Sequence, residues 1–329
     1  TGFIGTHLSS LLHEVHPETR IYNLDIVEPG TPLPTVKNYK PALGNGEEHA
    51  ATFIYCDVRQ PIELEKVNIT SDDVIFNFAA VHRTPGHPDP AYFETNIRGA
   101  ENVCAFAERH GIRKIVFTSS IAPYGAAEEL KEETTLPMPN TPYGISKLVA
   151  EKIHQTWQAG GEGRQLTIVR PGVVFGRGEN GNFTRLYWGI RGHKFMYPGR
   201  KDTIKACIYV KELVRFMLYR LEHHDSGVEL YNCCYEPAYT IEHIVESMKR
   251  VTNMKVKVPF MPGWLIMTAA GIAGALGSPM GICPARVRKL QISTNICGKK
   301  LSASGYRFRY TFEEALADWY KDNGNLYLQ

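Results

Sequence analysis

The sequence predicts an α/β protein in which a doubly wound parallel sheet is joined to a second, smaller region. Two observations support this prediction. From the start of the chain to Pro171, short apolar segments of strand length alternate with segments of helical pattern, which is typical of a parallel sheet covered by helices on both faces. After Pro171 this alternation stops, because Gly172–Lys205 is rich in glycine and also contains loop-forming Asn and Pro. The chain is therefore expected to contain two regions of different architecture.

The expected elements follow the chain in order. The segments with the length and apolar character of buried strands are Arg20–Asp25, Phe53–Asp57, Val74–Ala80, Lys114–Ser119, Leu166–Arg170 and Val228–Cys233. The segments with helical periodicity are Gly5–Val15, Pro90–His110, Tyr143–Gln158, Val210–Leu221, Ile241–Val251, the basic Pro284–Gln291 and Thr311–Asn323. We expect a first domain over residues 1–175 and 203–235, and a discontinuous substrate domain over residues 176–202 and 236–329 that covers the sheet edge where ligands bind.

The composition excludes several classes of protein. The 329 residues carry 37 Lys+Arg and 34 Asp+Glu without long runs of one sign, so a nucleic-acid-binding arm is not indicated. The seven cysteines include no C-x-x-C pair, which favours a reducing compartment and no zinc site. The longest apolar stretch, Trp264–Leu276, is shorter than the roughly 20 residues that span a bilayer. We therefore expect a soluble, cytoplasmic protein in which this stretch packs in the second domain or at a dimer face rather than on a membrane.

A glycine-rich turn lies at the start of the chain. Gly2 and Gly5 are spaced like the last two glycines of a G-x-x-G-x-x-G turn that runs into a helix, and we expect the first glycine and its strand to precede Thr1. In such a turn the backbone N–H groups, here around Phe3 and Ile4, and the positive end of the helix face a pyrophosphate, while Gly5 allows close packing on the sheet. The turn predicts a dinucleotide site.

An acidic residue follows at the spacing that such a site requires. Asp25 ends the next strand twenty residues after Gly5, where a carboxylate can accept hydrogen bonds from the ribose hydroxyls and repel a 2′-phosphate. This favours NAD over NADP. Asp57 ends the following strand at the same edge of the sheet and either approaches the adenine or forms a turn.

Three polar residues form a candidate catalytic set. Tyr143 and Lys147 are four residues apart, which places them on one face of a helix. A phenol with a reference pKa near 10 is a poor base at neutral pH, but an adjacent ammonium and a positive nicotinamide ring favour its phenolate. Ser120 follows a strand 23 residues upstream of Tyr143. All three side chains are therefore expected at the sheet edge that holds the cofactor.

Motifs in the first 180 residues carry a family resemblance. They are TGFIG at 1–5, Asp25, Asp57, NFAA at 77–80, ETNIRGAENV at 94–103, FTSSIAPYG at 117–125, PYGISK at 142–147 and IVRPGVVFGRG at 168–178. With these motifs in this order, the chain resembles an extended short-chain dehydrogenase/reductase of the NAD-dependent epimerase/dehydratase family. The resemblance implies a Rossmann-type domain with bound NAD.

The resemblance also implies roles for individual residues. Ser120, Tyr143 and Lys147 match the family's catalytic triad: the Tyr exchanges a proton with a substrate hydroxyl, the Ser hydrogen-bonds the same oxygen, and the Lys binds the nicotinamide ribose and lowers the Tyr pKa. The implied cofactor contacts are Gly2, Phe3, Ile4, Gly5, Asp25, Asp57, Val58, Ala79, Ala80, Tyr143, Lys147 and Pro171. The implied substrate contacts are His82, Ser120, Asn182, Phe183 and Lys205. Lys205 stands where many sugar epimerases carry an Arg, and it offers a point charge instead of a bidentate fork.

The residues after Ser120 argue against dehydration, because Ile121 and Ala122 cannot transfer a proton. Among the reactions that the resemblance implies, this leaves reversible oxidation and reduction at one carbon, and the substrate that the resemblance implies is a nucleotide-diphosphate sugar. The preference for NAD that Asp25 indicates favours an epimerase acting at sugar C4, since reductases more often use NADPH. A nucleotide-4-ketosugar reductase or dehydrogenase would use the same triad in one direction and remains an alternative.

Two further alternatives stay open. The segments Pro262–Leu276, Pro284–Leu290 and Leu301–Tyr320 resemble those of 3-beta-hydroxysteroid dehydrogenases of the same superfamily. A non-catalytic NAD-binding protein is disfavoured, because such a protein is free to lose any member of the triad. Relatives commonly dimerise through two helices per subunit, which here are Pro90–His110 and Tyr143–Gln158, so a homodimer is implied. The histidines show no metal-ligand spacing, and we assign no metal.

Overall fold

The computed structural model describes residues 2–28, 51–64, 67–82, 86–225, 227–265, 268 and 291–329. Its longer helices are α1 (Phe3–Val15), α2 (Asp89–Arg109), α3 (Pro142–Ala159), α4 (Asn182–Arg191), α5 (Val210–Glu222), α6 (Ile241–Val251) and α10 (Phe312–Asp322). Two short helices are η2 (Ala122–Tyr124) and α9 (Lys299–Ala303). Most of the predicted Trp264–Leu276 and Pro284–Gln291 segments lies outside the described residues.

The parallel sheet forms as predicted. Its central strands are β3 (Val74–Asn77), β4 (Lys114–Thr118), β6 (Gln165–Pro171) and β11 (Val228–Cys233), which are hydrogen-bonded in parallel in the order β11-β6-β4-β3. A separate parallel pair consists of β1 (Tyr22–Asp25) and β2 (Thr52–Tyr55). The strand expected before Thr1 stays a prediction. The central strands β4 and β6 are mostly apolar and almost wholly buried, as expected for strands covered on both faces, whereas both ends of β2 are exposed.

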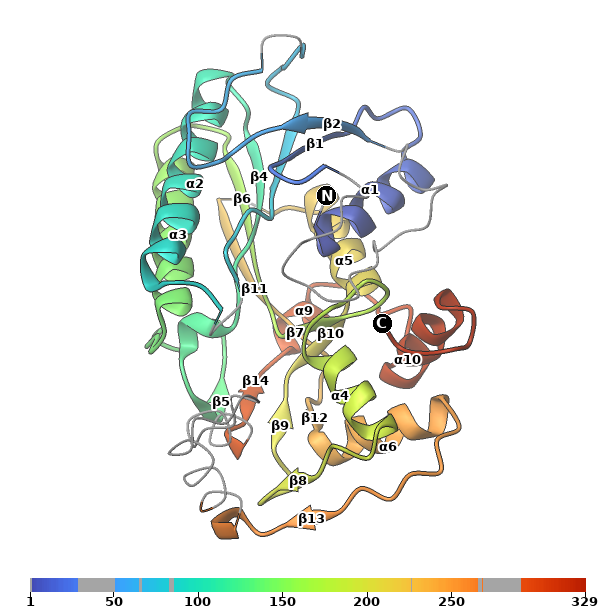
Figure 1. Ribbon diagram of the computed structural model, residues 1–329. Coiled ribbons are helices and arrows are strands. Elements are labelled where there is room, and N and C mark those ends of the chain that lie inside the picture. Colours follow the sequence, from blue (N-terminus) through green and yellow to red (C-terminus); the bar gives the residue numbers. More distant parts are fainter. Residues whose placement is uncertain are drawn as a thin grey trace.

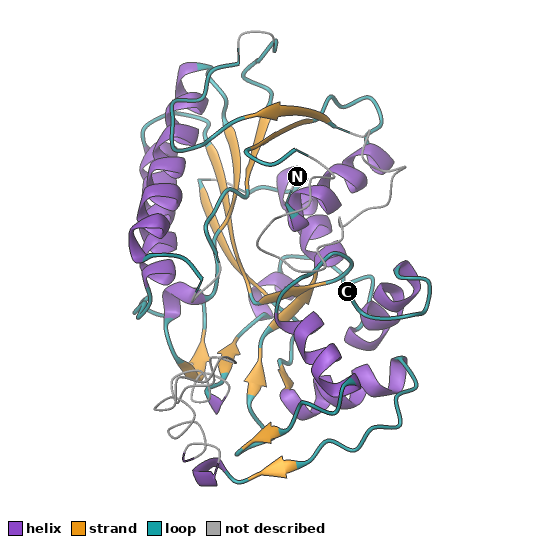
Figure 2. Ribbon diagram, viewed as in Figure 1, coloured by secondary structure: helices purple, strands orange, loops and turns teal. Residues whose placement is uncertain are grey.

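Helices cover both faces of this sheet (Figures 1 and 2). The long helices α2 and α3 pack against each other on one face, and α1 packs against α5 on the other. Ala100, Phe106 and Ala150 from the first pair join Ile115 and Leu166 of the sheet in one apolar core. The doubly wound architecture predicted from the sequence is therefore confirmed, and the helix ends bring the site residues to the carboxyl edge of the strands.

The second region has its own small sheet. Its strands are β5 (Ala127–Lys131), β9 (Ile204–Lys205), β12 (Tyr239–Thr240) and β14 (Thr294–Ile296), in the order β12-β9-β14-β5. Two separate parallel pairs lie outside this sheet. They are β7 (Val173–Phe175) with β10 (Cys207–Tyr209) and β8 (Tyr197–Pro198) with β13 (Phe260–Met261). We did not expect β5, which has the sequence AEELK and exposes Glu128, Glu129 and Leu130, because it lacks the apolar alternation that indicates a strand.

The segment from Gly172 to Lys205 contains more structure than its loop-like composition predicts. It includes α4, whose buried residues Phe183, Tyr187 and Ile190 recur at helical spacing. They belong to an aromatic core in which Phe175 stacks on Phe183 with ring centroids 4.8 Å apart. Glycines at both ends of the helix obscured its pattern. This core joins the second region to the parallel sheet through β7 and β10.

The six described cysteines, Cys56, Cys104, Cys207, Cys233, Cys234 and Cys297, are free thiols. Among the described helices, none combines the length and the apolar character that a bilayer span requires.

Candidate active site

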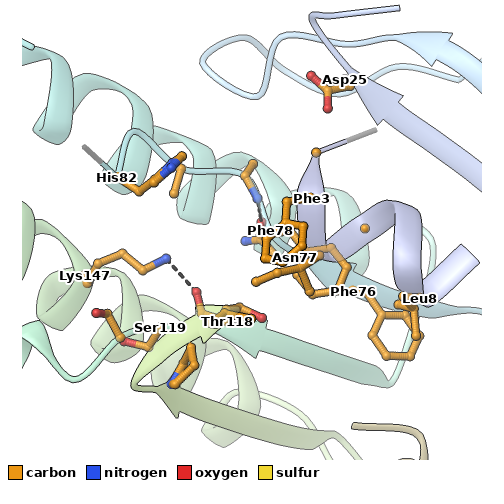
Figure 3. Close-up of a pocket in the computed structure, with 18 of the residues that line it drawn as sticks. Phe3, Leu8, Asp25, Phe76, Asn77, Phe78, His82, Thr118, Ser119 and Lys147 are labelled. Atoms are coloured by element: carbon orange, nitrogen blue, oxygen red, sulfur yellow. Dashed lines mark hydrogen bonds between the residues drawn. The ribbon is translucent and has the colours of Figure 1, made fainter. Parts of the chain in front are cut away.

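A continuous cleft of about 2230 Å³ contains most of the predicted site residues. Figure 3 shows Asp25 on one side and Lys147 and His82 on the other, with Phe3 and Phe78 between them. The cleft therefore connects the predicted cofactor end to the predicted catalytic end.

The start of α1 leaves backbone N–H groups available to a ligand. Gly2 is the N-cap and provides no side-chain cap, so the N–H groups of the first turn lack intrahelical partners. A Cβ added to Gly2 would meet no atom within 4 Å, whereas one added to Gly5 would lie 3.5 Å from the Phe78 ring, an ordinary contact. Gly2, Phe3, Ile4 and Gly5 all line the cleft, as an anion site at a helix N-terminus requires.

The two predicted carboxylates differ in their surroundings. Asp25 ends β1, lines the cleft and accepts a hydrogen bond from the Val27 N–H at 3.1 Å. Asp57 lies two residues beyond β2 and is held by the Arg59 guanidinium, with Nη2 2.6 Å from Oδ2. This bond lowers the pKa of Asp57. Asp25 is therefore positioned for a ribose, whereas Asp57 faces a neighbouring cation.

The loops after β2 and β3 are fixed to the helices behind them. The Val58 carbonyl accepts a bond from Asn102 Nδ2 at 2.7 Å, and a Cβ added to Gly99 would lie 3.0 Å from Val58 Cγ2. The Asn96 amide clamps Val81, accepting from its N–H at 2.8 Å and donating to its carbonyl at 3.1 Å. Val58, Ala79, Ala80 and His82 consequently line the cleft in fixed loops.

These residues together fit a dinucleotide. Free N–H groups at a helix start suit a pyrophosphate, a carboxylate at the next strand end suits a ribose, and both belong to one cleft. No group of three or more His, Cys, Asp or Glu among the described residues is arranged to hold a metal ion.

Ser120 and Tyr143 meet at the catalytic end of the cleft. Both residues line the cleft although they belong to different elements, and the Ser120 side chain acts to lower the pKa of Tyr143. Helix α3 approaches the loop after Ser120 so closely that a Cβ on Gly144 would lie 2.6 Å from the Ala122 carbonyl oxygen. The Thr141 side chain caps this helix by accepting from the Gly144 N–H at 3.1 Å. A glycine after Tyr143 therefore allows the contact between the two predicted catalytic hydroxyls.

Lys147 lies one turn further along α3, as its spacing predicts. Its side chain is 2% exposed. Its Nζ donates to the Thr118 carbonyl at 2.6 Å and lies 4.4 Å from the centroid of the Phe117 ring. Burial lowers the pKa of Lys147 to about 7, and the Glu151 carboxylate opposes this shift. The ammonium is thus held at the end of β4, beside the cleft.

The pKa of Tyr143 differs from the expectation. Burial raises it, and the hydrogen bond from Ser120 is the interaction that opposes this effect. Lys147 directs its ammonium to the Thr118 carbonyl. In the protein chain alone the pKa of Tyr143 is therefore raised, whereas we expected Lys147 to lower it, because the effect of burial is larger than that of the polar contacts.

A buried ion pair behind the triad was not predicted. The Arg170 guanidinium binds Glu151 through two bonds, Nε to Oε1 at 2.8 Å and Nη2 to Oε2 at 2.6 Å, and both side chains are buried. Ser119 Oγ donates to the same carboxylate at 2.5 Å. The position of Glu151, four residues after Lys147 on the helix, was the signal that could have identified it.

The predicted substrate residues are found in different surroundings. Asn182 is exposed at the start of α4 and accepts a bond from Arg185 at 2.7 Å. Phe183 is buried and stacked on Phe175. Lys205 lies on β9 and donates to the Ile292 carbonyl at 2.7 Å. These three residues line the cleft. Pro171, which was predicted as a cofactor contact, ends β6 and lines the cleft as well.

Comparison with known proteins agrees with this geometry. Residues 1–234 match the NAD dependent epimerase/dehydratase family. The chain is 32% identical to the N-acetyl-alpha-D-glucosaminyl-diphospho-ditrans,octacis-undecaprenol 4-epimerase of Escherichia coli O157:H7, over 79% of this chain and 80% of the relative. It is 24% identical to a 3-beta-hydroxysteroid dehydrogenase of Mycolicibacterium neoaurum, over 97% of this chain and 88% of that protein.

Solved structures show the same fold. A UDP-N-acetylglucosamine 4-epimerase from Methanobrevibacter ruminantium M1, in complex with UDP-N-acetylmuramic acid, superposes with a TM-score of 0.73 at 21% identity, covering 98% of this chain and 96% of the other. A UDP-glucuronic acid 4-epimerase from Bacillus cereus, in complex with NAD, gives 0.73 at 19% identity, covering 99% and 94%. The predicted fold class, enzymatic nature and cofactor are confirmed. The chain belongs to the NAD dependent epimerase/dehydratase family.

Proposed function

We propose that this protein is an NAD-dependent 4-epimerase of a diphosphate-linked sugar, with Ser120, Tyr143 and Lys147 as its catalytic residues. The observation that carries the proposal is that one cleft is lined by the first turn of α1 with its free N–H groups, by the Asp25 carboxylate, and by Ser120, Tyr143 and Lys147. The similarity to an epimerase of a diphosphate-linked amino sugar supports it.

In this mechanism Tyr143 moves the proton of the C4 hydroxyl. Its oxygen takes that proton while Ser120 holds the same sugar oxygen by a hydrogen bond. The first turn of α1 and the Asp25 carboxylate would hold NAD, which would supply reversible hydride acceptance at C4 of the sugar. Tyr143 then gives the proton back, so atoms and electrons balance over the cycle. Since burial raises the pKa of Tyr143, its phenolate depends on positive charge near the ring, from the Lys147 ammonium and the oxidised cofactor.

Lys147 has a second role in this account. Its Nζ lies at the end of β4 beside the cleft, where an ammonium can donate to the nicotinamide ribose. Lys205 on β9 and Asn182 and Phe183 on α4 also line the cleft. We infer that they meet the sugar and its diphosphate, with His82 on the loop after β3.

Two alternatives use the same residues. A ketosugar reductase or dehydrogenase would release reduced or oxidised cofactor in each turnover. The second alternative is a steroid dehydrogenase, which the 24% identity to such an enzyme over nearly the whole chain supports. Incubation with a panel of diphosphate sugars and catalytic NAD separates these functions. We expect a new sugar isomer without net NADH, and stoichiometric NADH or activity on a steroid alone would contradict the proposal.

Replacing the proposed base tests the residue assignment. Tyr143→Phe is expected to abolish nearly all turnover while NAD binding persists, because the ring still packs but has no hydroxyl to move the proton. Normal turnover in this variant would remove Tyr143 from the mechanism.

We also propose that the protein is a homodimer in the cytoplasm, with α2 and α3 at the interface. Ile145 and Val149 lie four residues apart on α3 and are exposed, as a helical interface stripe would be. Light scattering should show a dimer, and Ile145→Glu/Val149→Glu should give a monomer. A dimer that survives both substitutions would place the interface elsewhere.

A further inference from the structure

We propose that one edge of the second region docks on an anionic membrane surface, and that the diphosphate sugar is carried there on a polyprenyl lipid. The edge consists of Lys194, Lys255, Lys257, Phe260, Trp264 and Leu265, and we call it the basic aromatic edge. The identity of the lipid carrier rests on the proposed function, whereas docking does not.

Large apolar side chains are concentrated on this edge. Phe260, Trp264 and Leu265 lie within six residues of one another and are 52%, 72% and 41% exposed. Trp264 and Leu265 begin the apolar stretch that the sequence predicts to pack against protein rather than on a membrane, and their exposure is the reason to revise that prediction for this end of the stretch. Exposed Trp and Phe side chains are common where proteins contact the headgroup region of a bilayer. Isolated exposed apolar residues need no explanation, but three at the end of one short segment indicate an interaction surface.

The backbone of residues 254–261 is fixed by packing and by hydrogen bonds to neighbouring segments. Met254, Val256 and Val258 pack against the aromatic core, while the alternating Lys255 and Lys257 are exposed. Strand β13 then pairs in parallel with β8, and the Tyr197 N–H donates to the Pro259 carbonyl at 2.9 Å. The exposed lysines and aromatic residues therefore extend from a backbone that packing and hydrogen bonds fix in place.

The charge of the edge is positive. Among ion pairs of the described residues, none involves Lys194, Lys255 or Lys257. The nearby carboxylates on α6 are already paired, Glu242 with Lys201 at 3.0 Å and Glu246 with Lys249 at 2.9 Å. Lysines beside exposed aromatic residues complement the negative surface of a membrane that contains anionic lipids.

The edge is connected to the cleft. Figure 1 shows the chain from α6 to β13 running along the lower margin of the molecule, beneath β8 and β9. Pro198 of β8 and Lys205 of β9 both line the cleft, and β8 is bonded directly to β13. Docking by this edge would bring the substrate side of the cleft close to the bilayer surface.

The chemistry of the carrier follows from this geometry. A nucleotide-linked sugar is soluble and gains nothing from a membrane-docking edge. A sugar diphosphate on a polyprenyl chain stays in the bilayer, so its enzyme has to work at the surface. The E. coli relative is named for such a lipid-linked sugar.

Vesicle sedimentation tests the docking. The full chain is mixed with phosphatidylcholine vesicles with or without phosphatidylglycerol. We expect roughly tenfold more bound protein when the anionic lipid is present, and a loss of most of this binding in Phe260→Ser/Trp264→Ser and in Lys255→Glu/Lys257→Glu. Leu326→Ser is the matched control, because Leu326 is 64% exposed on the C-terminal tail. Equal binding by all of these proteins, or none by the wild type, would overturn the docking proposal.

Rates on two substrates test the carrier. N-acetylglucosaminyl-diphospho-polyprenol in anionic vesicles is compared with UDP-N-acetylglucosamine in solution. We expect the lipid-linked sugar to be the better substrate, and the ratio of the two rates to fall about tenfold in Phe260→Ser/Trp264→Ser. A preference for the nucleotide sugar would overturn the lipid carrier. Absence of turnover on both would contradict the proposed function, and the sedimentation result would still decide the docking.

Discussion

Glu151 lies one helical turn beyond Lys147 on α3, and its carboxylate is the group that raises the pKa of Lys147 against the effect of burial. Arg170 holds that carboxylate by two hydrogen bonds, and Ser119, the neighbour of the proposed catalytic Ser120, donates a third. The charge of Lys147 therefore depends on a buried acid that does not itself line the cleft.

The first prediction concerns this dependence. Glu151→Gln removes the negative charge and leaves Arg170 positive, so the pKa of Lys147 should fall below about 7. Since the mechanism needs the ammonium, the alkaline limb of the kcat/KM profile should move to lower pH, with roughly tenfold less activity at pH 8. Steady-state kinetics across pH measures this. Glu151→Asp, which keeps the charge, should restore most of the wild-type profile, and a uniform loss at every pH would instead indicate a structural role.

The second prediction concerns stability. The pKa of Lys147 is about 7 in the folded protein and 10.5 in the unfolded reference. Between these values the unfolded chain binds more protons, so this lysine makes the wild type more stable as pH rises. Lys147→Met lacks the effect. Its stability relative to the wild type should therefore decrease from pH 7 to pH 9, by at most about 1.4 kcal/mol per pH unit. Urea unfolding of both proteins measures the difference in the free energy of unfolding. A difference that does not change with pH would contradict the lowered pKa of Lys147.

The third prediction concerns Gly144. A Cβ at this position would lie 2.6 Å from the Ala122 carbonyl oxygen, so Gly144→Ala must push α3 away from the loop that carries Ser120. We expect a fall in kcat of roughly 10- to 100-fold, because small displacements of catalytic groups are costly. Gly189→Ala on α4 is the control, since its Cβ would lie 3.4 Å from Phe195 and away from the triad. Equal kinetics in both variants would mean that the contact between Ser120 and Tyr143 tolerates the shift.

The fourth prediction concerns cofactor choice. Asp25→Ala should relax the preference for NAD over NADP by roughly tenfold, because it removes both the ribose acceptor and the repulsion of a 2′-phosphate. Asp25→Asn keeps an acceptor for the Val27 N–H and separates the effect of charge from that of the local bond. Dissociation constants for the two cofactors provide the test. An unchanged ratio in both variants would remove the argument for a ribose contact at Asp25.

The sequence predicted those parts of the site that depend on local periodicity. Tyr143 and Lys147 share a helix face because they are four residues apart, and Asp25 lies in the cleft because it ends a parallel strand. The helix α4 was missed, since its glycine-rich flanks hide the spacing of Phe183, Tyr187 and Ile190.

Contacts between distant segments could not be derived in this way. The bond between Arg170 and Glu151 and the position of β5 beside β14 depend on how separate elements pack. The pKa of Tyr143 is a similar case, because its rise comes from burial by the whole fold. Local pattern indicated which residues carry the chemistry, whereas packing determines their charge.

The central claim is that the protein oxidises the C4 carbon and returns the same hydride to the opposite face. The most direct measurement supplies a diphosphate-linked N-acetylglucosamine with deuterium at C4, on a nucleotide and on a polyprenyl carrier, and analyses the product by NMR and mass spectrometry. We expect an inverted C4 that retains its deuterium, with no net NADH. Loss of deuterium to solvent, or one NADH for each sugar oxidised, would contradict the account.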